Sequence, residues 1–308
     1  MAKMKKPVLL FASMALAVLL ACTTAVLTAA PGGGQTTTTV TLVGAGDIAD
    51  CSYDRDQATA KVLASVSGTV FTLGDNVYPN GTATQFQNCY RPTWGAQKSR
   101  TKPSAGNHDY YTQSASGYFG YFGARAGDPS RGYYSYNRGA WHVIALNSNC
   151  DKIGGCGSRS AQYKWLQRDL AANSSSCTLA YFHHPLFTST GGTSTVARPF
   201  WNLLHNHNAD VILSGHAHYY ERFAPQLPDG TRDADRGIRE FVVGTGGNSP
   251  QNPMTSPRIR NSVVDSEKSP GVTAYGVLRL RLSAGSYTWK FLPVAGETFT
   301  DSGTGQCH

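Results

Sequence analysis

The ends of the predicted β-strands constrain the fold of this chain more than any other feature of its sequence. Four short apolar segments are each followed, within a few residues, by aspartate or histidine: residues 40–43 by Asp47, residues 69–73 by Asp75, residues 178–182 by His183, and residues 210–213 by His216 and His218. In open α/β proteins, ligands bind beyond the carboxyl ends of the strands, where the connecting loops converge. The pattern therefore predicts an α/β protein in which carboxylates and imidazoles gather at one edge of a sheet.

Helix and strand signals between these segments favour a layered α/β fold. Helices are predicted from apolar faces at three places: Thr59, Val62, Leu63 and Val66, with Asp54 or Asp56 as the N-cap; Tyr163, Leu166 and Leu170; and Phe200, Leu203 and Leu204, beginning at Pro199. Further strands are predicted at residues 142–146 and 241–243, and residues 276–282 and 287–292 alternate as a hairpin that turns at Ala284 and Gly285. Because no internal linker or repeat divides residues 40–308, we expect a single domain with a β-rich C-terminal end.

The N-terminal residues predict export. Lys3, Lys5 and Lys6 precede an apolar stretch at residues 8–20, and small residues follow up to Ala30. This pattern is typical of a secretory signal peptide at residues 1–30, followed by a polar spacer at residues 31–39, and it is wrongly flanked for a membrane span. We therefore expect a secreted protein without a transmembrane span in the mature chain. Alternatively, residues 19–22 resemble a bacterial lipoprotein cleavage box, which would anchor the protein through a lipid on Cys22.

The cysteine content agrees with an oxidising compartment. Six cysteines remain beyond Cys22: Cys51, Cys89, Cys150, Cys156, Cys177 and Cys307. An even number in an exported chain predicts up to three disulfides, and Cys150 with Cys156 is the favoured pair because it closes a small loop. Zinc binding by these cysteines is disfavoured because no C-x-x-C spacing occurs. Charged residues make up only 15% of the chain and no basic run follows residue 6, so nucleic-acid binding is not indicated.

The polar residues near the strand ends have the chemistry of a two-metal site. Asn107 and His108 lie in a loop of similar character to the strand ends, and His216 and His218 point to the same side of an extended segment. Carboxylate, amide and imidazole donors suit two adjacent divalent or trivalent ions, with one carboxylate shared between them. Each motif alone has an ordinary structural explanation, such as a turn or a core histidine. The ordered series GD, GDNVY, GNHD, FHHP and GHAH is what favours a metal site.

This series resembles the calcineurin-like metallophosphoesterase superfamily over essentially the whole mature chain. Two details are similar to its purple acid phosphatase branch. Ala49 replaces a histidine that many superfamily members have two places after the first aspartate, and Tyr78 occupies the position of a tyrosinate ligand. The segment GHAHYYER also resembles that branch. The resemblance implies a four-layer αββα sandwich of two mixed sheets flanked by helices.

The resemblance also implies two metal ions and their ligands. The first ion would be bound by Asp47, Asp75, Tyr78 and His218, and the second by Asp75, Asn107, His183 and His216. Fe(III) is expected at the Tyr78 site, and Zn(II), Fe(II) or Mn(II) at the second. A metal-bound hydroxide would attack the phosphorus atom of a phosphate ester.

Three further residues are candidates for catalysis. His108 would stabilise charge or donate a proton to the leaving group, and Asp109 would orient His108 unless it is a turn residue. Plant and mammalian relatives carry a loop histidine where this chain has Gly192 and Thr193, so His184 is a candidate substitute, with simple packing as the alternative. His142 is interpreted as structural.

We expect a secreted phosphatase that acts on phosphomonoesters. The alternatives are a phosphodiesterase or nucleotidase on the same metal core, and a catalytically inactive cell-surface binding protein. Inactivity is disfavoured because all seven expected ligand positions are filled. Tyr219 and Tyr220 are expected to form walls of the site, while the roles of Glu221 and Arg222 stay open between loop support and substrate contact.

Overall fold

The computed structural model describes residues 1–4, 38–189, 194–249, 261–266 and 274–308. The chain divides into two units, Met1–Thr36 and Thr37–His308. Residues 1–4 have no regular secondary structure, and the fold below is that of the second unit. Most of the predicted signal peptide and spacer, Cys22, and the loop positions Gly192 and Thr193 lie outside the described residues. Within the described residues, no helix is long and apolar enough to cross a membrane.

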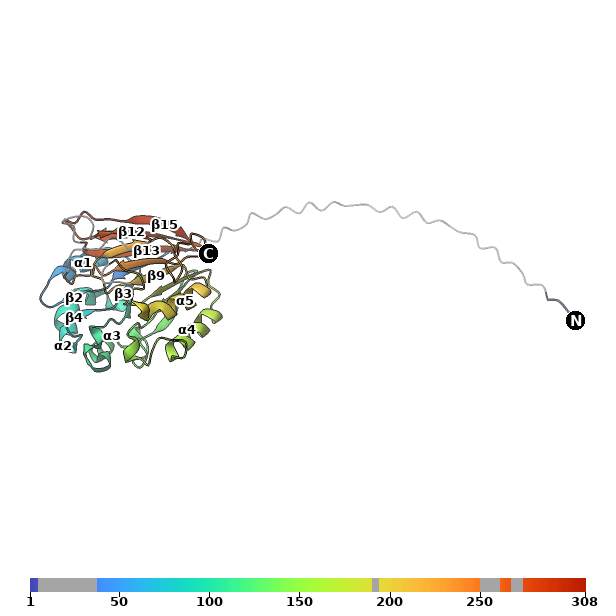
Figure 1. Cartoon of the computed structure of the whole chain (residues 1–308), viewed down its shortest axis with the longest axis horizontal. Helices are drawn as coiled ribbons and strands as arrows, with labels where there is room; N and C mark the ends of the chain where they lie inside the picture. Colours follow the sequence, from blue (N-terminus) through green and yellow to red (C-terminus); the bar gives the residue numbers. More distant parts are fainter. Residues whose placement is uncertain (5–37, 190–193, 250–260, 267–273) are drawn as a thin grey trace. The chain divides into compact units, whose positions relative to one another are not determined.

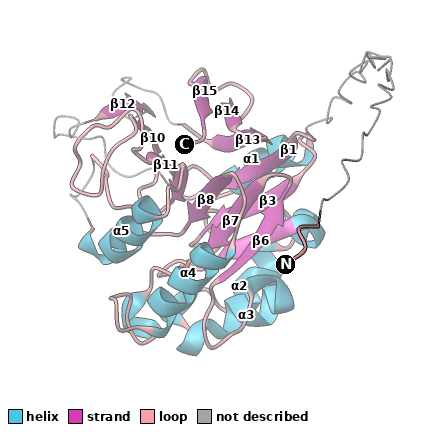
Figure 2. Cartoon of the chain, turned by 90° about the vertical axis from the view of Figure 1, so that its right-hand side faces the viewer, coloured by secondary structure: helices cyan, strands magenta, loops and turns pink. Residues whose placement is uncertain are grey.

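Two mixed β-sheets form the framework of the second unit (Figures 1 and 2). The first sheet has the order β15-β14-β13-β1-β3-β5: β1 Val40–Ala45, β3 Thr69–Leu73, β5 Thr101–Ser104, β13 Gly276–Ser283, β14 Ser286–Pro293 and β15 Ser302–Gln306. The second has the order β12-β10-β11-β9-β8-β7-β6: β6 Tyr134–Arg138, β7 Trp141–Ala145, β8 Cys177–Tyr181, β9 Val211–Ser214, β10 Tyr220–Phe223, β11 Arg239–Val243 and β12 Ser262–Asp265. A short parallel pair is formed by β2 Ala49–Asp50 and β4 Val77–Tyr78.

Parallel strands occupy the centre of each sheet. In the first sheet β1, β3 and β5 run parallel, and the C-terminal strands β13 to β15 add an antiparallel edge. In the second sheet β7, β8, β9 and β11 run parallel, with antiparallel strands at both edges. The carboxyl ends of the parallel strands therefore lie at a common edge of each sheet, as expected from the strand-end pattern.

Helices cover the outer faces of the two sheets (Figure 2). The α-helices are α1 Arg55–Ala64, α2 Ala83–Gln85, α3 Ser116–Phe122, α4 Ala161–Ala172 and α5 Arg198–Asn206. Helix α1 contacts β13 and β14 of the first sheet, whereas α4 and α5 pack on the second. This arrangement confirms the predicted four-layer αββα fold with a β-rich C-terminal end.

Alternating side chains of the second sheet build two cores. Val143, Leu179 and Val211 belong to the cluster that also contains the first sheet, and the Tyr181 ring lies 6.2 Å from that of Phe71 across the interface. The residues next to them in sequence, Ile144, Ala180 and Ile212, instead pack with Leu166, Phe200 and Leu204 of α4 and α5. The period of two along each strand thus places one core between the sheets and another under the helices.

The predicted elements match the observed ones within one or two residues, with one correction in the first helix. Helix α1 ends at Ala64, so Val66 lies beyond it, and Asp54 occupies the N-cap position without a side-chain capping bond. The apolar face of that helix is therefore shorter than its sequence pattern predicts. His142 binds Asp169 through Nε2 at 2.7 Å and Asn137 through Nδ1 at 2.8 Å, in agreement with a structural role.

Three disulfides stabilise the fold, one within a short loop and two between more distant parts of the chain. The pairs are Cys51–Cys89, Cys150–Cys156 and Cys177–Cys307, with sequence separations of 38, 6 and 130 residues. All six expected cysteines are paired, and the favoured pair Cys150–Cys156 is among them. Because Cys177 begins β8 and Cys307 follows β15, the third disulfide links the second sheet to the last strand of the first.

Candidate metal centre

Three of the expected ligands share an unusual backbone conformation directly beyond their strands. Asp47, Asp75 and His216 have φ angles of 58°, 48° and 68°, in the left-handed region that non-glycine residues rarely occupy. Each follows a glycine in the sequence. Residues in such conformations cluster at functional sites, where the surrounding structure compensates for their strain. The sharp turns direct the three side chains into one shared space at the sheet edge.

The first group of donors surrounds the hydroxyl of Tyr78. Its Oη lies 2.9 Å from Asp47 Oδ1, 2.9 Å from Asp75 Oδ2 and 3.2 Å from His218 Nε2. His218 Nε2 lies 3.4 Å from Asp47 Oδ1. The four residues expected for the first ion therefore lie together, although 171 positions separate Asp47 from His218 (218 minus 47).

The second group is formed by one amide, two imidazoles and the same aspartate. Asn107 Oδ1 lies 3.0 Å from His183 Nε2 and 3.1 Å from His216 Nδ1, and the two histidine nitrogens are 3.1 Å apart. His183 Nε2 also lies 3.3 Å from Asp75 Oδ2. Asp75 Oδ2 therefore contacts one member of each group, Tyr78 of the first and His183 of the second.

Backbone carbonyls orient two of the imidazoles toward the groups of donors. His183 Nδ1 donates to the Leu73 carbonyl at 2.7 Å, and His218 Nδ1 donates to the Ser249 carbonyl at 2.8 Å. Each bond places a ring proton on Nδ1 and turns Nε2 toward the carboxylates, which is how metal-binding histidines are commonly oriented. Hard oxygen donors combined with inward-facing imidazole nitrogens fit two transition-metal cations. The sequence motifs do not reveal these carbonyls, although the glycine-rich turn after β11 marks the loop that carries Ser249.

Burial and mutual charge set the protonation of the donors. Burial, together with Asp47 and Asp75, raises the pKa of the Tyr78 phenol well above its usual range. Burial opposes charge on His183 and Asp75, but their attraction outweighs it, raising the pKa of His183 and lowering that of Asp75. A cation bound among these side chains would reverse the preferences of Tyr78 and His183, because ligands bind metals in their deprotonated forms.

His108 lies at the side of the first group. Its ring is flanked by Tyr78, at a centroid distance of 4.4 Å, and by Tyr111, at 4.5 Å, and its Nδ1 lies 2.6 Å from the Pro79 carbonyl. Of the two roles that the sequence leaves open for Asp109, its contacts agree with that of a turn residue and not with that of a partner of the His108 ring. Its buried carboxylate accepts hydrogen bonds from Gly106 N and Asn76 Nδ2, both at 2.9 Å. Asp109 therefore stabilises the turn that carries Asn107 and His108, and Pro79 is the partner of the His108 ring.

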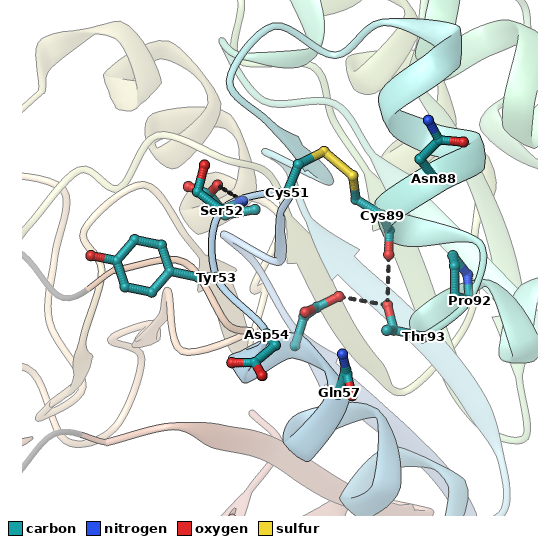
Figure 3. Close-up of a pocket in the computed structure, with 11 residues that line it drawn as sticks. Cys51, Ser52, Tyr53, Asp54, Gln57, Asn88, Cys89, Pro92 and Thr93 are labelled. Carbon is teal, nitrogen blue, oxygen red and sulfur yellow. Dashed lines mark hydrogen bonds between the residues drawn. A yellow bond between two sulfur atoms is a disulfide. The ribbon is translucent and has the colours of Figure 1, made fainter.

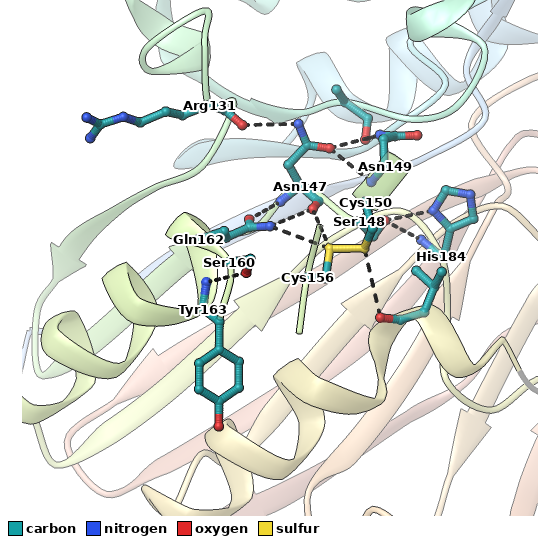
Figure 4. The surroundings of a disulfide bond; sticks show 12 residues. Arg131, Asn147, Ser148, Asn149, Cys150, Cys156, Ser160, Gln162, Tyr163 and His184 are labelled. Atoms are coloured by element: carbon teal, nitrogen blue, oxygen red, sulfur yellow. Dashed lines mark hydrogen bonds between the residues drawn. A yellow bond between two sulfur atoms is a disulfide. The ribbon is translucent and has the colours of Figure 1, made fainter. Parts of the chain in front are cut away.

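His184 lies beside the second group, and Figure 4 shows it next to Ser148, near the Cys150–Cys156 disulfide. Its ring centroid is 4.6 Å from that of His216 and 4.9 Å from that of His183. The hydroxyl of Ser148, a residue that the sequence does not single out, lies 2.8 Å from His184 Nδ1 and accepts from the His184 backbone N–H at 3.0 Å. Burial and the neighbouring imidazoles lower the pKa of His184 to about 2, so its ring is neutral. A neutral ring can donate a hydrogen bond, but it does not carry the proton of an imidazolium.

Tyr219 and Tyr220 are not walls of the centre, contrary to prediction. Both are buried, Tyr219 binding Glu221 through its hydroxyl at 2.7 Å and Tyr220 binding Asp301 at 2.6 Å. Glu221 also accepts from the Ser189 N–H at 2.9 Å, and Arg222 pairs with Asp301 at 2.7 Å. Glu221 and Arg222 thus support the surrounding loops through their side chains.

A cavity of about 450 Å³ lies beside the Cys51–Cys89 disulfide (Figure 3). Asp50, Asp54 and Asp56 line it, together with the polar residues Ser52, Gln57, Asn88 and Thr93. Asp56 is only 4% exposed and accepts from the Thr93 hydroxyl at 2.6 Å. Burial raises the pKa of Asp56 to about 6, although the bond from Thr93 opposes this shift.

Replacing Asp56 by asparagine is expected to change the pH dependence of stability. Between about pH 4 and pH 6 the folded protein retains the Asp56 proton that the unfolded chain has lost, so wild-type stability falls as pH rises through this window. Above it the variant has no charge to bury and should be more stable by about 1–3 kcal/mol. Urea unfolding at pH 4 and pH 8 measures this difference. Asp54→Asn, at an exposed carboxylate of the same cavity, is the matched control. An Asp56→Asn variant that is less stable than wild type at pH 8 would contradict the prediction.

The four-layer fold and its clustered oxygen and imidazole donors define a metallophosphoesterase. Residues 40–220 match the family model described as calcineurin-like phosphoesterase, and the chain belongs to that family. Among curated proteins it is 25% identical over 217 residues to purple acid phosphatase 15 of Arabidopsis thaliana, which covers 58% of this chain and 40% of that protein. It is 29% identical over 201 residues to an uncharacterized protein of Mycobacterium tuberculosis, covering 53% and 38% of the two chains. The matched region thus spans less than half of either relative.

Solved structures show the same fold at lower sequence identity. Purple acid phosphatase PPD1 from yellow lupin seeds has a TM-score of 0.67 at 17% identity, over 87% of this chain and 54% of that one. GAP50, described as the anchor in the inner membrane complex of Plasmodium, has a TM-score of 0.64 at 14% identity, over 88% and 89%. These structures show that the fold is shared, and the match of residues 40–220 to the family model is what assigns the chain to the calcineurin-like phosphoesterases.

Proposed function

We propose that the protein is an exported phosphatase that hydrolyses phosphomonoesters at a dinuclear metal centre. The observation that carries this proposal is the position of Asp75 Oδ2, 2.9 Å from Tyr78 Oη and 3.3 Å from His183 Nε2, between two complete sets of donors. The first set is Asp47, Asp75, Tyr78 and His218, and the second is Asp75, Asn107, His183 and His216. Fe(III) suits the first because the phenolate of Tyr78 is a hard donor, and Zn(II), Fe(II) or Mn(II) suits the second.

The chain's own side chains supply orientation and proton transfer. Two ions bound in the centre would lower the pKa of a coordinated water and neutralise charge on the phosphoryl oxygens. His184, which is neutral, donates a hydrogen bond from its ring to a phosphoryl oxygen, and Ser148 fixes that ring. His108, clamped between Tyr78 and Tyr111, donates the proton that the leaving-group oxygen needs. Asp109 acts only through the turn that positions Asn107 and His108.

The choice of ester is tested by comparing an aryl monophosphate with a bis-aryl phosphodiester. With iron and zinc supplied, we expect kcat/KM to be at least about tenfold higher for the monoester, a difference of about 1.4 kcal/mol in activation free energy. A preference for the diester would favour a phosphodiesterase. A protein that contains two ions per chain and hydrolyses neither ester would instead be a binding protein.

As part of the same proposal, the protein is exported: residues 1–30 are a signal peptide, residues 31–39 a spacer, and residues 40–308 a single domain. The three disulfides support an oxidising location. Mass spectrometry of the N-terminal peptide tests it, because cleavage near residue 30 leaves a soluble chain. A lipid-modified Cys22 at the N-terminus would show an anchored protein instead.

A further inference from the structure

Three aromatic rings form a row from the first donor group to the surface. The Tyr78 and His108 rings are tilted by 51° at 4.4 Å, and the His108 and Tyr111 rings by 47° at 4.5 Å. Tyr78 is only 3% exposed, whereas Tyr111 is 59% exposed. One end of the row therefore meets the carboxylates of the candidate metal centre, and the other end meets solvent.

The position of Tyr111 in this row is fixed by its backbone. Tyr111 ends the short 3-10 helix Asp109–Tyr111, and its N–H donates to the His108 carbonyl at 3.2 Å. The buried carboxylate of Asp109 binds Gly106 and Asn76, and the His108 ring binds the Pro79 carbonyl. These contacts hold the turn in place, and the turn holds the exposed ring of Tyr111 beside His108.

Such exposure is unusual for an aromatic side chain of this protein. Among the residues that the structure describes, the large hydrophobic side chains that are well exposed include only two aromatic ones, Tyr53 and Tyr111. Tyr53 lies by the cavity at the Cys51–Cys89 disulfide, whereas Tyr111 contacts His108, the residue proposed to protonate the leaving group. An exposed flat ring at this place offers a surface on which another ring can pack.

We propose that Tyr111 determines specificity by packing against an aromatic leaving group of the phosphomonoester. This inference rests on the proposed function and narrows its substrate class to esters of phenols and of other ring-bearing alcohols. When the phosphoryl group lies among the donors, the leaving group extends past His108 toward solvent, where Tyr111 is the next ring. An aromatic leaving group gains an edge-to-face or offset contact there, and a short alkyl group does not reach it.

The test is binding of two phosphonates to the metal-loaded protein, measured by titration calorimetry. Phenylphosphonate and methylphosphonate carry the same anionic group, and only the first carries a ring. Replacing Tyr111 by leucine, which keeps apolar packing on His108, should weaken phenylphosphonate binding about three- to tenfold, because aromatic pairs contribute about 0.5–1.5 kcal/mol beyond area burial. Methylphosphonate binding should change less than about twofold, while Tyr111→Phe should restore phenylphosphonate binding because the ring is kept.

Tyr53→Leu is the matched control, because it removes another exposed tyrosine, 51% exposed, beside the cavity at the Cys51–Cys89 disulfide. Equal weakening of both phosphonates in Tyr111→Leu would show that Tyr111 only positions His108, and would overturn the inference. No change for either phosphonate would overturn it as well. Because binding is measured without turnover, selective loss of phenylphosphonate would support the role of Tyr111 even if no ester were hydrolysed, a result that would contradict the proposed function alone.

Discussion

Replacing Asp75 by asparagine is expected to lower kcat/KM for an aryl monophosphate by about a thousandfold or more, which corresponds to about 4 kcal/mol. Asp75 Oδ2 contacts Tyr78 of the first donor group and His183 of the second, so one substitution removes negative charge from both. Asparagine keeps the size of the side chain and tolerates the left-handed backbone at this position. The loss should therefore report the missing charge and not a disturbed fold.

Metal content and a matched variant distinguish the loss of the Asp75 charge from a loss of folded structure. Elemental analysis should find fewer than two ions per chain in Asp75→Asn, because a neutral amide does not offset the repulsion between two cations. Asp128→Asn, at an exposed carboxylate paired with Arg131, should keep both the ions and the activity. An Asp75→Asn protein that keeps two ions and more than about a tenth of wild-type activity would show that Asp75 does not bridge.

Replacing Tyr78 by phenylalanine is expected to abolish the visible colour of the iron-loaded protein. Burial and two carboxylates keep the free phenol protonated, so only a strongly charged ion such as Fe(III) would ionise it and give a tyrosinate charge-transfer band. The substitution removes one oxygen atom and leaves the ring that packs on His108. A visible spectrum recorded after reconstitution with iron measures the change.

Tyr90→Phe is the control for this spectrum. Tyr90 is fully buried, and its hydroxyl has no hydrogen-bond partner among the described residues, so its loss should leave the band intact. If wild-type protein with a full complement of iron is colourless, or if Tyr78→Phe keeps the band, Tyr78 is not an iron ligand. A colourless but active protein that contains only zinc or manganese would remove the Fe(III) assignment and leave the phosphatase proposal in place.

The strand ends could be predicted from sequence because local rules determine them. Short apolar runs that end at glycine or histidine mark buried parallel strands. Asp47 and Asp75 follow strands of the first sheet, His183 and His216 follow strands of the second, and the packing of the two sheets brings the four residues together. Strand β5 escaped prediction because Lys102 and Pro103 interrupt its apolar pattern, and the structure places it at the edge of its sheet, where proline is tolerated.

The interpretation of Tyr219 and Tyr220 failed for a different reason, and the choice between the two roles of Glu221 and Arg222 could not be made from sequence for the same reason. Their polarity suggested a lining of the site, but Tyr220 and Arg222 bind Asp301, about eighty positions further along the chain. A buried polar residue is stable only with its partner, and a partner so distant in sequence leaves no local signal. The same holds for the Leu73 and Ser249 carbonyls that orient His183 and His218, because every residue has a carbonyl and only the fold selects two of them.

The described domain also begins and ends at one corner. Thr39 directly precedes β1, and its hydroxyl lies 2.9 Å from that of Ser283, the last residue of β13. The Cys307 N–H donates to the carbonyl of Gly285, in the turn between β13 and β14. Asp47 lies beyond the opposite end of β1, a strand roughly 20 Å long. A fusion partner, an affinity tag or an immobilising surface joined to either end would therefore attach at the corner farthest along β1 from the candidate centre. Substrate could still approach an enzyme displayed in this way.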